Sequence, residues 1–224
     1  MLNYTNYLAS KKIVIDTQEA LEETHRLFDE LSYKILSTSN KLAIERGKYP
    51  KFYDSHWADG KVPLDFANPR ALALTEYQPD NEKWDKLRES IKKFGVRNAL
   101  HMAIAPTATS GKAASATESI EPIVNLFYKE EGTSNVPTLV PNFRKNNKYY
   151  KNAFDCDQMK LLEGAAIRQI YLDQSQSLNM YSKRPDSFSE LLETHLYAYK
   201  LGIKTLYYFK QLKAEDEVDC ESCT

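Results

Sequence analysis

The strongest constraint on the fold is the alternation of helix-like and strand-like segments over residues 82–209. Such alternation is typical of α/β proteins, in which a helix connects each strand to the next parallel strand. Only three or four candidate strands are present, which is too few to close a barrel. We therefore predict an α/β fold with a largely parallel sheet that this chain does not close by itself.

Capping residues and the spacing of apolar side chains predict the helices. Helices are expected at residues 17–46, 81–94 and 157–172, and from residue 187 onward. Thr17 is suited to cap the first helix, and Gly47 and Gly95 to end the first two. Ser187 and Glu190 have the spacing of a capping box. The expected packing face of the last helix comprises Leu191, Leu192, His195, Leu196 and Tyr199.

Runs of apolar, β-branched and aromatic residues predict the strands. Buried strands are expected over residues 96–105 and 201–209, a hairpin within 121–140 with its turn at 131–134, and a short strand within 173–181. We expect the polar residues of 173–181 to rim a functional site. The last strand contains adjacent tyrosines, Tyr207 and Tyr208. A buried phenol requires a hydrogen-bond partner, so a core position that needed only a large apolar side chain would more readily carry Phe or Leu. The ordinary explanation is nevertheless a packed core or interface pair.

The segment at residues 106–110 follows the first expected strand and leads into small residues. A helix that begins here leaves backbone N–H groups pointing out of its N-terminus, where they can bind a phosphate. Thr107, Thr109 and Ser110 add hydroxyl donors. An ordinary helix N-cap is the alternative explanation.

Two cysteines, Cys220 and Cys223, lie in a polar tail that has almost no apolar residue to anchor it. Exposed thiols are reactive, so this pair is suited to carry electrons as a mobile dithiol. Zinc binding is the alternative, but zinc needs four ligands and no second Cys or His pair accompanies these two.

The charge and the cysteine content exclude several classes of protein. The formal net charge of -1 gives no basic surface for nucleic acid or for an anionic membrane. No apolar run is long enough to span a bilayer, and the N-terminus lacks an apolar signal core. Three cysteines, two of them near the C-terminus, argue against structural disulfides and for a reducing compartment. We expect a cytoplasmic protein without a metal site.

Two stretches of the sequence resemble one known family. The first is LRESIKKFGVRNALHMAIAPTATSGKAASATESIEP, and the second runs from DQSQSLNMY through FSELLETHLYAYKLGIKTLYY to the terminal cysteines. Both are similar to the C-terminal part of the large (α) subunit of class I ribonucleotide reductase. The resemblance implies that residues 1–210 form the second half of a ten-stranded α/β barrel, completed by another chain. It also implies that residues 211–224 form a flexible redox-active tail.

The resemblance implies a role for each candidate site residue. The phosphates of a ribonucleoside diphosphate would be bound by Pro106, Thr107, Ala108, Thr109 and Ser110. Tyr207 and Tyr208 would pass on a radical supplied by the metal centre of the small (β) subunit. Their rings would then have to touch, which requires the strand to end or bend, because adjacent strand residues face opposite sides. Cys220 and Cys223 would hand on electrons from thioredoxin or glutaredoxin.

The sequence lacks the family's thiyl-radical cysteine, its neighbouring Asn and Glu, and the catalytic cysteine pair. We therefore expect a split large subunit of ribonucleoside-diphosphate reductase, in which a separate N-terminal chain carries the radical cysteine. This chain would bind no cofactor and would be inactive without its partners. Two other functions stay open: a non-catalytic nucleotide-binding or assembly partner of a reductase complex, and a dithiol redox carrier.

Overall fold

The computed structural model describes residues 1–129, 137–184 and 187–212. The helices are α1 (Tyr4–Ser10), α2 (Gln18–Arg46), α3 (Pro69–Leu72), α4 (Asn81–Phe94), α5 (Ala108–Ala113), α6 (Phe143–Asn146), α7 (Gln158–Gln169) and α8 (Phe188–Lys200). Short 3₁₀ helices are η1 (Phe52–Asp54), η2 (His56–Asp59), η3 (Pro63–Phe66) and η4 (Asn147–Tyr149). The strands are β1 (Phe127–Lys129), β2 (Pro137–Leu139), β3 (Met180–Ser182) and β4 (Phe209–Gln211).

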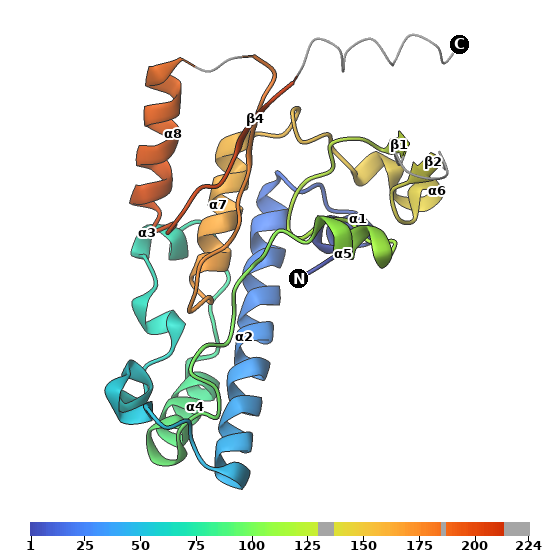
Figure 1. The fold of residues 1–224 in the computed structure, drawn as a ribbon. Helices are drawn as coiled ribbons and strands as arrows, with labels where there is room; N and C mark the ends of the chain where they lie inside the picture. Colours follow the sequence, from blue (N-terminus) through green and yellow to red (C-terminus); the bar gives the residue numbers. More distant parts are fainter. Residues whose placement is uncertain (130–136, 185–186, 213–224) are drawn as a thin grey trace, which may run out of the picture.

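The long helix α2 runs through the middle of the molecule (Figure 1). The Thr17 hydroxyl accepts the Ala20 N–H at 3.2 Å, and Gly47 ends the helix. These boundaries confirm the predicted helix. Its inward side chains, including Phe28 and Leu36, are almost fully buried. Within the described ranges, no helix is both long enough and apolar enough to cross a membrane.

A buried carboxylate joins α2 to α4. Asp29 of α2 accepts the Nε1–H of Trp84 at 2.7 Å and the Tyr77 hydroxyl at 3.0 Å. Gly95 ends α4 as predicted, with φ at +84°. A Cβ atom at this position would lie 2.7 Å from the Cβ of Lys48, so the chain requires glycine here both for its conformation and for space.

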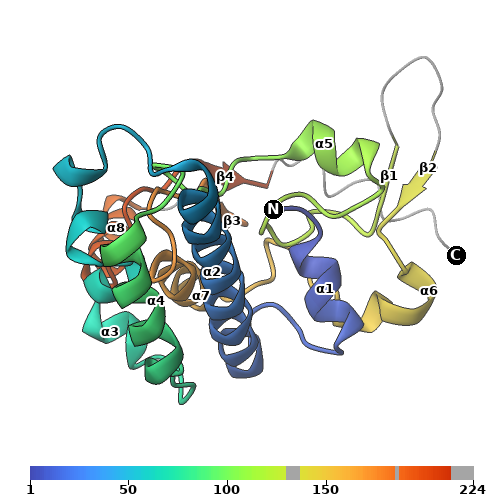
Figure 2. The same ribbon diagram turned by 90° about the horizontal axis from the view of Figure 1, so that it is seen from below.

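The remaining helices lie on two sides of α2. Figures 1 and 2 show α1, α5, α6 and the β1–β2 hairpin on one side, and α3, α4 and α8 on the other. Helix α7 lies beside α2. The capping box of α8 is confirmed, because the Ser187 hydroxyl accepts the Glu190 N–H at 3.3 Å and the Glu190 carboxylate accepts the Ser187 N–H at 2.8 Å.

The prediction of a buried strand over residues 96–105 is wrong. The segment is extended, but Leu100 is exposed, and Ile104 forms an isolated parallel bridge with Gln176. The Asp173 carboxylate accepts the N–H groups of His101 and Met102, each at 2.7 Å. A side chain thus takes the donors that a neighbouring strand would have used.

Three extended segments nevertheless run parallel and side by side, at residues 101–105, 173–182 and 205–212. The Ile104 N–H donates to the Ser175 carbonyl at 3.2 Å, and the Ser177 N–H donates to the Ile104 carbonyl at 2.8 Å. Strands β3 and β4 join the second segment to the third. The parallel arrangement confirms an α/β chain, although it has little regular sheet.

The predicted hairpin is also confirmed. Strands β1 and β2 are antiparallel, with Phe127 opposite Leu139. The expected turn at residues 131–134 lies outside the described residues.

Candidate functional site

Tyr207 and Tyr208 are in direct contact just before β4. Their ring centroids are 4.0 Å apart, and the ring planes make an angle of 48°. Each tyrosine is 54% exposed, so the prediction of a buried strand over residues 201–209 is wrong at these positions. Ile203 is buried, but the regular strand begins only at Phe209. Because water can satisfy an exposed hydroxyl, the pair does not depend on core packing within this chain.

A one-residue bulge explains why adjacent rings meet. The Met180 N–H donates to the Tyr208 carbonyl at 2.8 Å, and a regular parallel ladder would next pair the Tyr208 N–H with the Leu178 carbonyl. The Tyr207 N–H donates to that carbonyl instead, at 2.8 Å. Two tyrosines therefore stand opposite one residue, Asn179, and the alternation of side chains is interrupted. The bend expected at the tyrosine pair is confirmed.

Tyr208 also influences the protonation of Tyr207. Hydrogen bonding to Tyr208 raises the pKa of Tyr207 above its ordinary value of 10.0. Tyr207 is therefore neutral at pH 7. The next residue, Phe209, stacks on His195 of α8 with centroids 5.2 Å apart and an interplanar angle of 15°, so the ring contact ties α8 to β4.

The expected phosphate loop leads into α5. Helix α5 begins at Ala108, and the Gly111 N–H donates to the Thr107 carbonyl at 2.7 Å. Ala108, Thr109 and Ser110 are exposed. The Thr107 hydroxyl accepts the Ser119 N–H at 3.0 Å. This hydrogen bond joins the residue before α5 to the segment that follows α5. The backbone N–H groups of the first turn point outward from the helix.

The loop and the tyrosine pair lie at the same end of the parallel segments. Ile104 in the first segment pairs with Gln176 in the second. The loop begins two residues after Ile104. The tyrosine pair, in the third segment, lies opposite Asn179 of the second segment. The loop and the pair are therefore separated by the intervening segment at residues 173–182.

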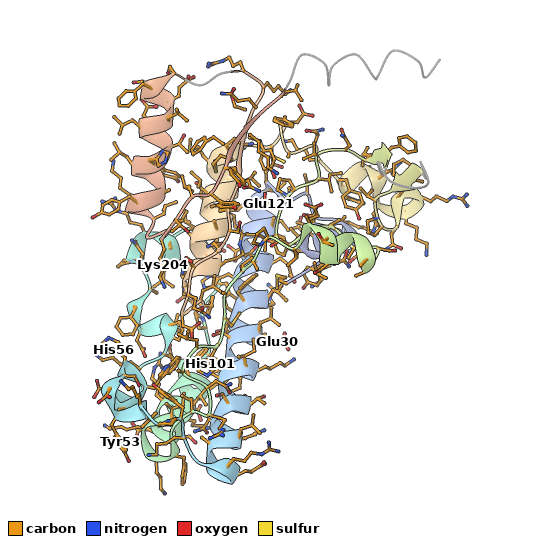
Figure 3. The ribbon with its side chains drawn as sticks, viewed as in Figure 1. Glu30, Tyr53, His56, His101, Glu121 and Lys204 are labelled. Carbon is orange, nitrogen blue, oxygen red and sulfur yellow. The ribbon has the colours of Figure 1, made fainter. Side chains whose placement is uncertain are left out.

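One residue near the tyrosine pair, Glu121, was assigned no site role from the sequence. Glu121 accepts the Asn179 N–H at 3.2 Å and the Tyr181 hydroxyl at 2.8 Å. Burial raises the pKa of Glu121 above 4.5, although these two hydrogen bonds oppose the rise. Figure 3 shows Glu121 beside α7 among the side chains that fill the interior. The only sequence signal was an acid between the apolar residues Ile120 and Ile123.

The cysteines divide into two kinds. Cys220 and Cys223 lie outside the described residues. Cys156 is buried, and burial raises the pKa of its thiol to about 12. It is a packed thiol. Among the described residues there is no cluster of three His, Cys, Asp or Glu side chains that would suit a metal ion.

The predicted packing face of α8 is wrong. Leu192 and Leu196 are each 46% exposed and Tyr199 is 80% exposed, while Ala198 is the buried residue of this helix. Phe188 at the start of α8 is also exposed. Apolar side chains therefore form a row along the outer side of α8 that no described part of this chain covers.

The chain thus presents parallel segments flanked by helices, with a polar loop at one end, as in α/β proteins. The family model described as "Ribonucleotide reductase, barrel domain" matches residues 1–209. The chain therefore belongs to the ribonucleotide reductase family.

The curated relatives that match it are alpha subunits of ribonucleoside-diphosphate reductase. The subunit of Helicobacter pylori (strain J99) is 38% identical over 208 residues, which cover 91% of this chain and 26% of the relative. The Mycoplasma genitalium subunit is 31% identical over 251 residues, with 100% of this chain and 35% of the relative covered. The subunit alpha of Escherichia coli (strain K12) reductase 1 is 32% identical over 218 residues, with 93% and 28% covered. The chain thus spans between 26% and 35% of the length of these relatives.

Proposed function

We propose that this chain supplies three functional parts to a ribonucleoside-diphosphate reductase, which converts ribonucleotides to deoxyribonucleotides by radical chemistry. The parts are the substrate loop at residues 106–110, the radical-transfer pair Tyr207 and Tyr208, and the dithiol Cys220 and Cys223. The observation that carries the proposal is the 4.0 Å contact of two exposed tyrosine rings in a chain of this family.

The geometry of the pair suits stepwise radical transfer. A neutral phenol loses an electron and a proton together, so no phenolate has to form beforehand. Tyr207, whose pKa is raised by Tyr208, stays protonated at pH 7. Ring contact gives a short path for the electron, and exposure leaves the pair accessible to the chain that supplies the radical.

The loop suits the phosphates of the substrate. Ala108, Thr109 and Ser110 are exposed at the start of α5, so their backbone N–H groups and two hydroxyls are available to phosphate oxygens. Ala108 can contribute only its N–H. Since the loop lies one segment away from the tyrosine pair, a bound nucleotide would sit near the end of the radical path.

The proposed enzyme needs other chains. The N-terminal half of the large subunit would complete the barrel and bring the thiyl-radical cysteine, and the metal centre of the small (β) subunit would supply the radical. Thioredoxin or glutaredoxin in the cytoplasm would reduce Cys220 and Cys223. The uncovered apolar row on α8 supports a partner chain at this face.

The test is tyrosine-to-phenylalanine substitution in the reconstituted complex. Tyr207→Phe and Tyr208→Phe each remove the oxidisable hydroxyl, so nearly all turnover should be lost, while the free energy of unfolding should change by less than about 0.5 kcal/mol. The control is Tyr53→Phe, at an exposed tyrosine that lies at the opposite end of the molecule from β4 (Figures 1 and 3). This variant should keep full turnover.

Other outcomes would identify a different function. Wild-type turnover in either variant would end the radical-transfer proposal. Nucleotide binding without any turnover in the complete complex would point to an assembly partner. Reduction of disulfides by this chain alone would point to a dithiol carrier.

A further inference from the structure

The bulge leaves one backbone donor without its ladder partner. Because Tyr207 takes the Leu178 carbonyl, the Tyr208 N–H has to find another acceptor. It donates to Oδ1 of Asn179 at 3.3 Å. Asn179, the one residue opposite the two tyrosines, thus supplies with its side chain the acceptor that the ladder has lost.

The Asn179 side chain is itself held in one orientation. Asn179 is only 7% exposed, and its side chain lies close enough to the Tyr181 hydroxyl to lower the pKa of that phenol, although burial raises it overall. The Tyr181 hydroxyl already donates to the Glu121 carboxylate, so it can only accept from Asn179. The amide NH₂ group must therefore face Tyr181, which leaves Oδ1 for the Tyr208 N–H.

The network continues into the interior. Glu121 also accepts the Asn179 backbone N–H at 3.2 Å, so both the main chain and the side chain of Asn179 are fixed. Arg168, which is 4% exposed, contributes to the electrostatic stabilisation of the Glu121 carboxylate. A buried polar network of this kind holds a single geometry when every member is satisfied.

We propose that Asn179 is a positioning residue that keeps Tyr207 and Tyr208 in ring contact by stabilising the bulge. Without its Oδ1, the Tyr208 N–H has a ready alternative in the Leu178 carbonyl, which restores a regular ladder. In a regular ladder adjacent side chains point to opposite faces, so the two rings separate. This inference rests on the proposed radical-transfer function, but the bulge itself can be tested separately.

The first test compares two substitutions in the full chain. Asn179→Leu keeps the branching at Cγ but has no acceptor. Asn179→Asp keeps an acceptor for the Tyr208 N–H, and the Tyr181 hydroxyl can rotate to donate to it. With 3-fluorotyrosine incorporated and the two signals assigned through Tyr207→Phe and Tyr208→Phe, ¹⁹F NMR reports the ring contact. We expect both signals to move toward those of exposed tyrosine in Asn179→Leu and to stay near their wild-type positions in Asn179→Asp.

The second test measures steady-state kinetics in the reconstituted complex. Asn179→Leu should lower kcat about tenfold or more, since a regular ladder then competes with the bulge, whereas KM for the nucleotide should not change. Asn179→Asp should restore most of the lost kcat. If Asn179→Leu does not yield a folded chain, Tyr181→Phe removes the group that orients the amide and should lower kcat by a smaller factor, about two- to fivefold.

The outcomes separate this inference from the function on which it rests. Unchanged ¹⁹F signals and unchanged kcat in Asn179→Leu, or in Tyr181→Phe where that variant replaces it, would overturn the positioning role even if Tyr207→Phe is inactive. Shifted signals together with full turnover in Tyr207→Phe would instead uphold Asn179 as the support of the bulge and refute radical transfer. A rise in KM equal to the fall in kcat/KM would reduce Asn179 to a structural residue.

Discussion

The carboxylate of Asp173 offers the sharpest test of how the loop-bearing segment is held. It accepts the N–H groups of His101 and Met102, each at 2.7 Å, and its side chain is 10% exposed. In Asp173→Asn the side-chain amide still accepts one N–H but turns its own donor toward the other. Hydrogen bonds to a charged group contribute about 1.5–3 kcal/mol each, so we expect the free energy of unfolding at pH 7 to fall by about 2 kcal/mol.

The stability difference between wild type and Asp173→Asn should depend on pH in a defined direction. Burial alone would raise the pKa of Asp173, but the nearby His101 side chain and the two N–H donors outweigh it, and the pKa lies below its ordinary value of 3.8. A carboxyl group with a lowered pKa stabilises the fold above its unfolded-state pKa and loses that effect as the pH falls through the folded-state pKa. The difference between wild type and Asp173→Asn should therefore be constant from pH 7 to about pH 5 and shrink below about pH 4.

Urea unfolding followed by tryptophan fluorescence measures this difference, because Trp57 lies against His101 with ring centroids 4.8 Å apart. A change of about 2 kcal/mol corresponds to a Tm lower by about 4–8 °C in a chain of this size. The control is Asp59→Asn at an exposed position, which should be neutral within about 0.5 kcal/mol. An Asp173→Asn variant as stable as this control, or a difference that grows in acid, would refute the reasoning.

Three further predictions concern other parts of the chain. In urea unfolding, Gly95→Ala should cost about 1–3 kcal/mol more than Gly47→Ala. Both glycines have positive φ, but a Cβ atom added at Gly95 would lie 2.7 Å from the Cβ of Lys48, whereas one added at Gly47 would have no neighbour within 4 Å. Equal costs would contradict this. In a variant without the tail cysteines, Cys156, with its thiol pKa raised to about 12, should react with iodoacetamide at pH 7 only after unfolding, as mass spectrometry would reveal. Burial lowers the pKa of His25 below 6.5, so the free energy of unfolding of the wild type should fall as the pH falls from about 6.5 toward 5. In His25→Gln the free energy of unfolding should depend less on pH over this range. Identical pH dependence in unfolding titrations of the two proteins would argue against this prediction.

Much of the local structure was predictable because its signals are short in range. A Thr or Ser side chain caps the helix that begins one residue later, and the glycines after α2 and α4 end them through their own backbone conformation. The hairpin and the parallel order of the extended segments were predictable for a similar reason, since they follow from turn residues and from helices that connect the segments.

The failed predictions share a different cause. In the expected strand at residues 96–105, the N–H groups of His101 and Met102 donate to the Asp173 carboxylate instead of to a neighbouring strand. Asp173 lies about seventy residues further along the chain. The expected packing face of α8 is periodic in the sequence, but periodicity identifies an apolar face without saying what covers it. In this chain that face is exposed.

The sequence by itself determined that helices and strands alternate, where the helices begin and end, and that two adjacent phenols follow a polar stretch, because these depend on neighbouring residues. Only the tertiary structure decided that the phenols touch. Their contact depends on a bulge whose hydrogen bonds come from Leu178, Asn179 and Met180, and no local propensity of Tyr207 or Tyr208 specifies which carbonyl a distant segment will offer.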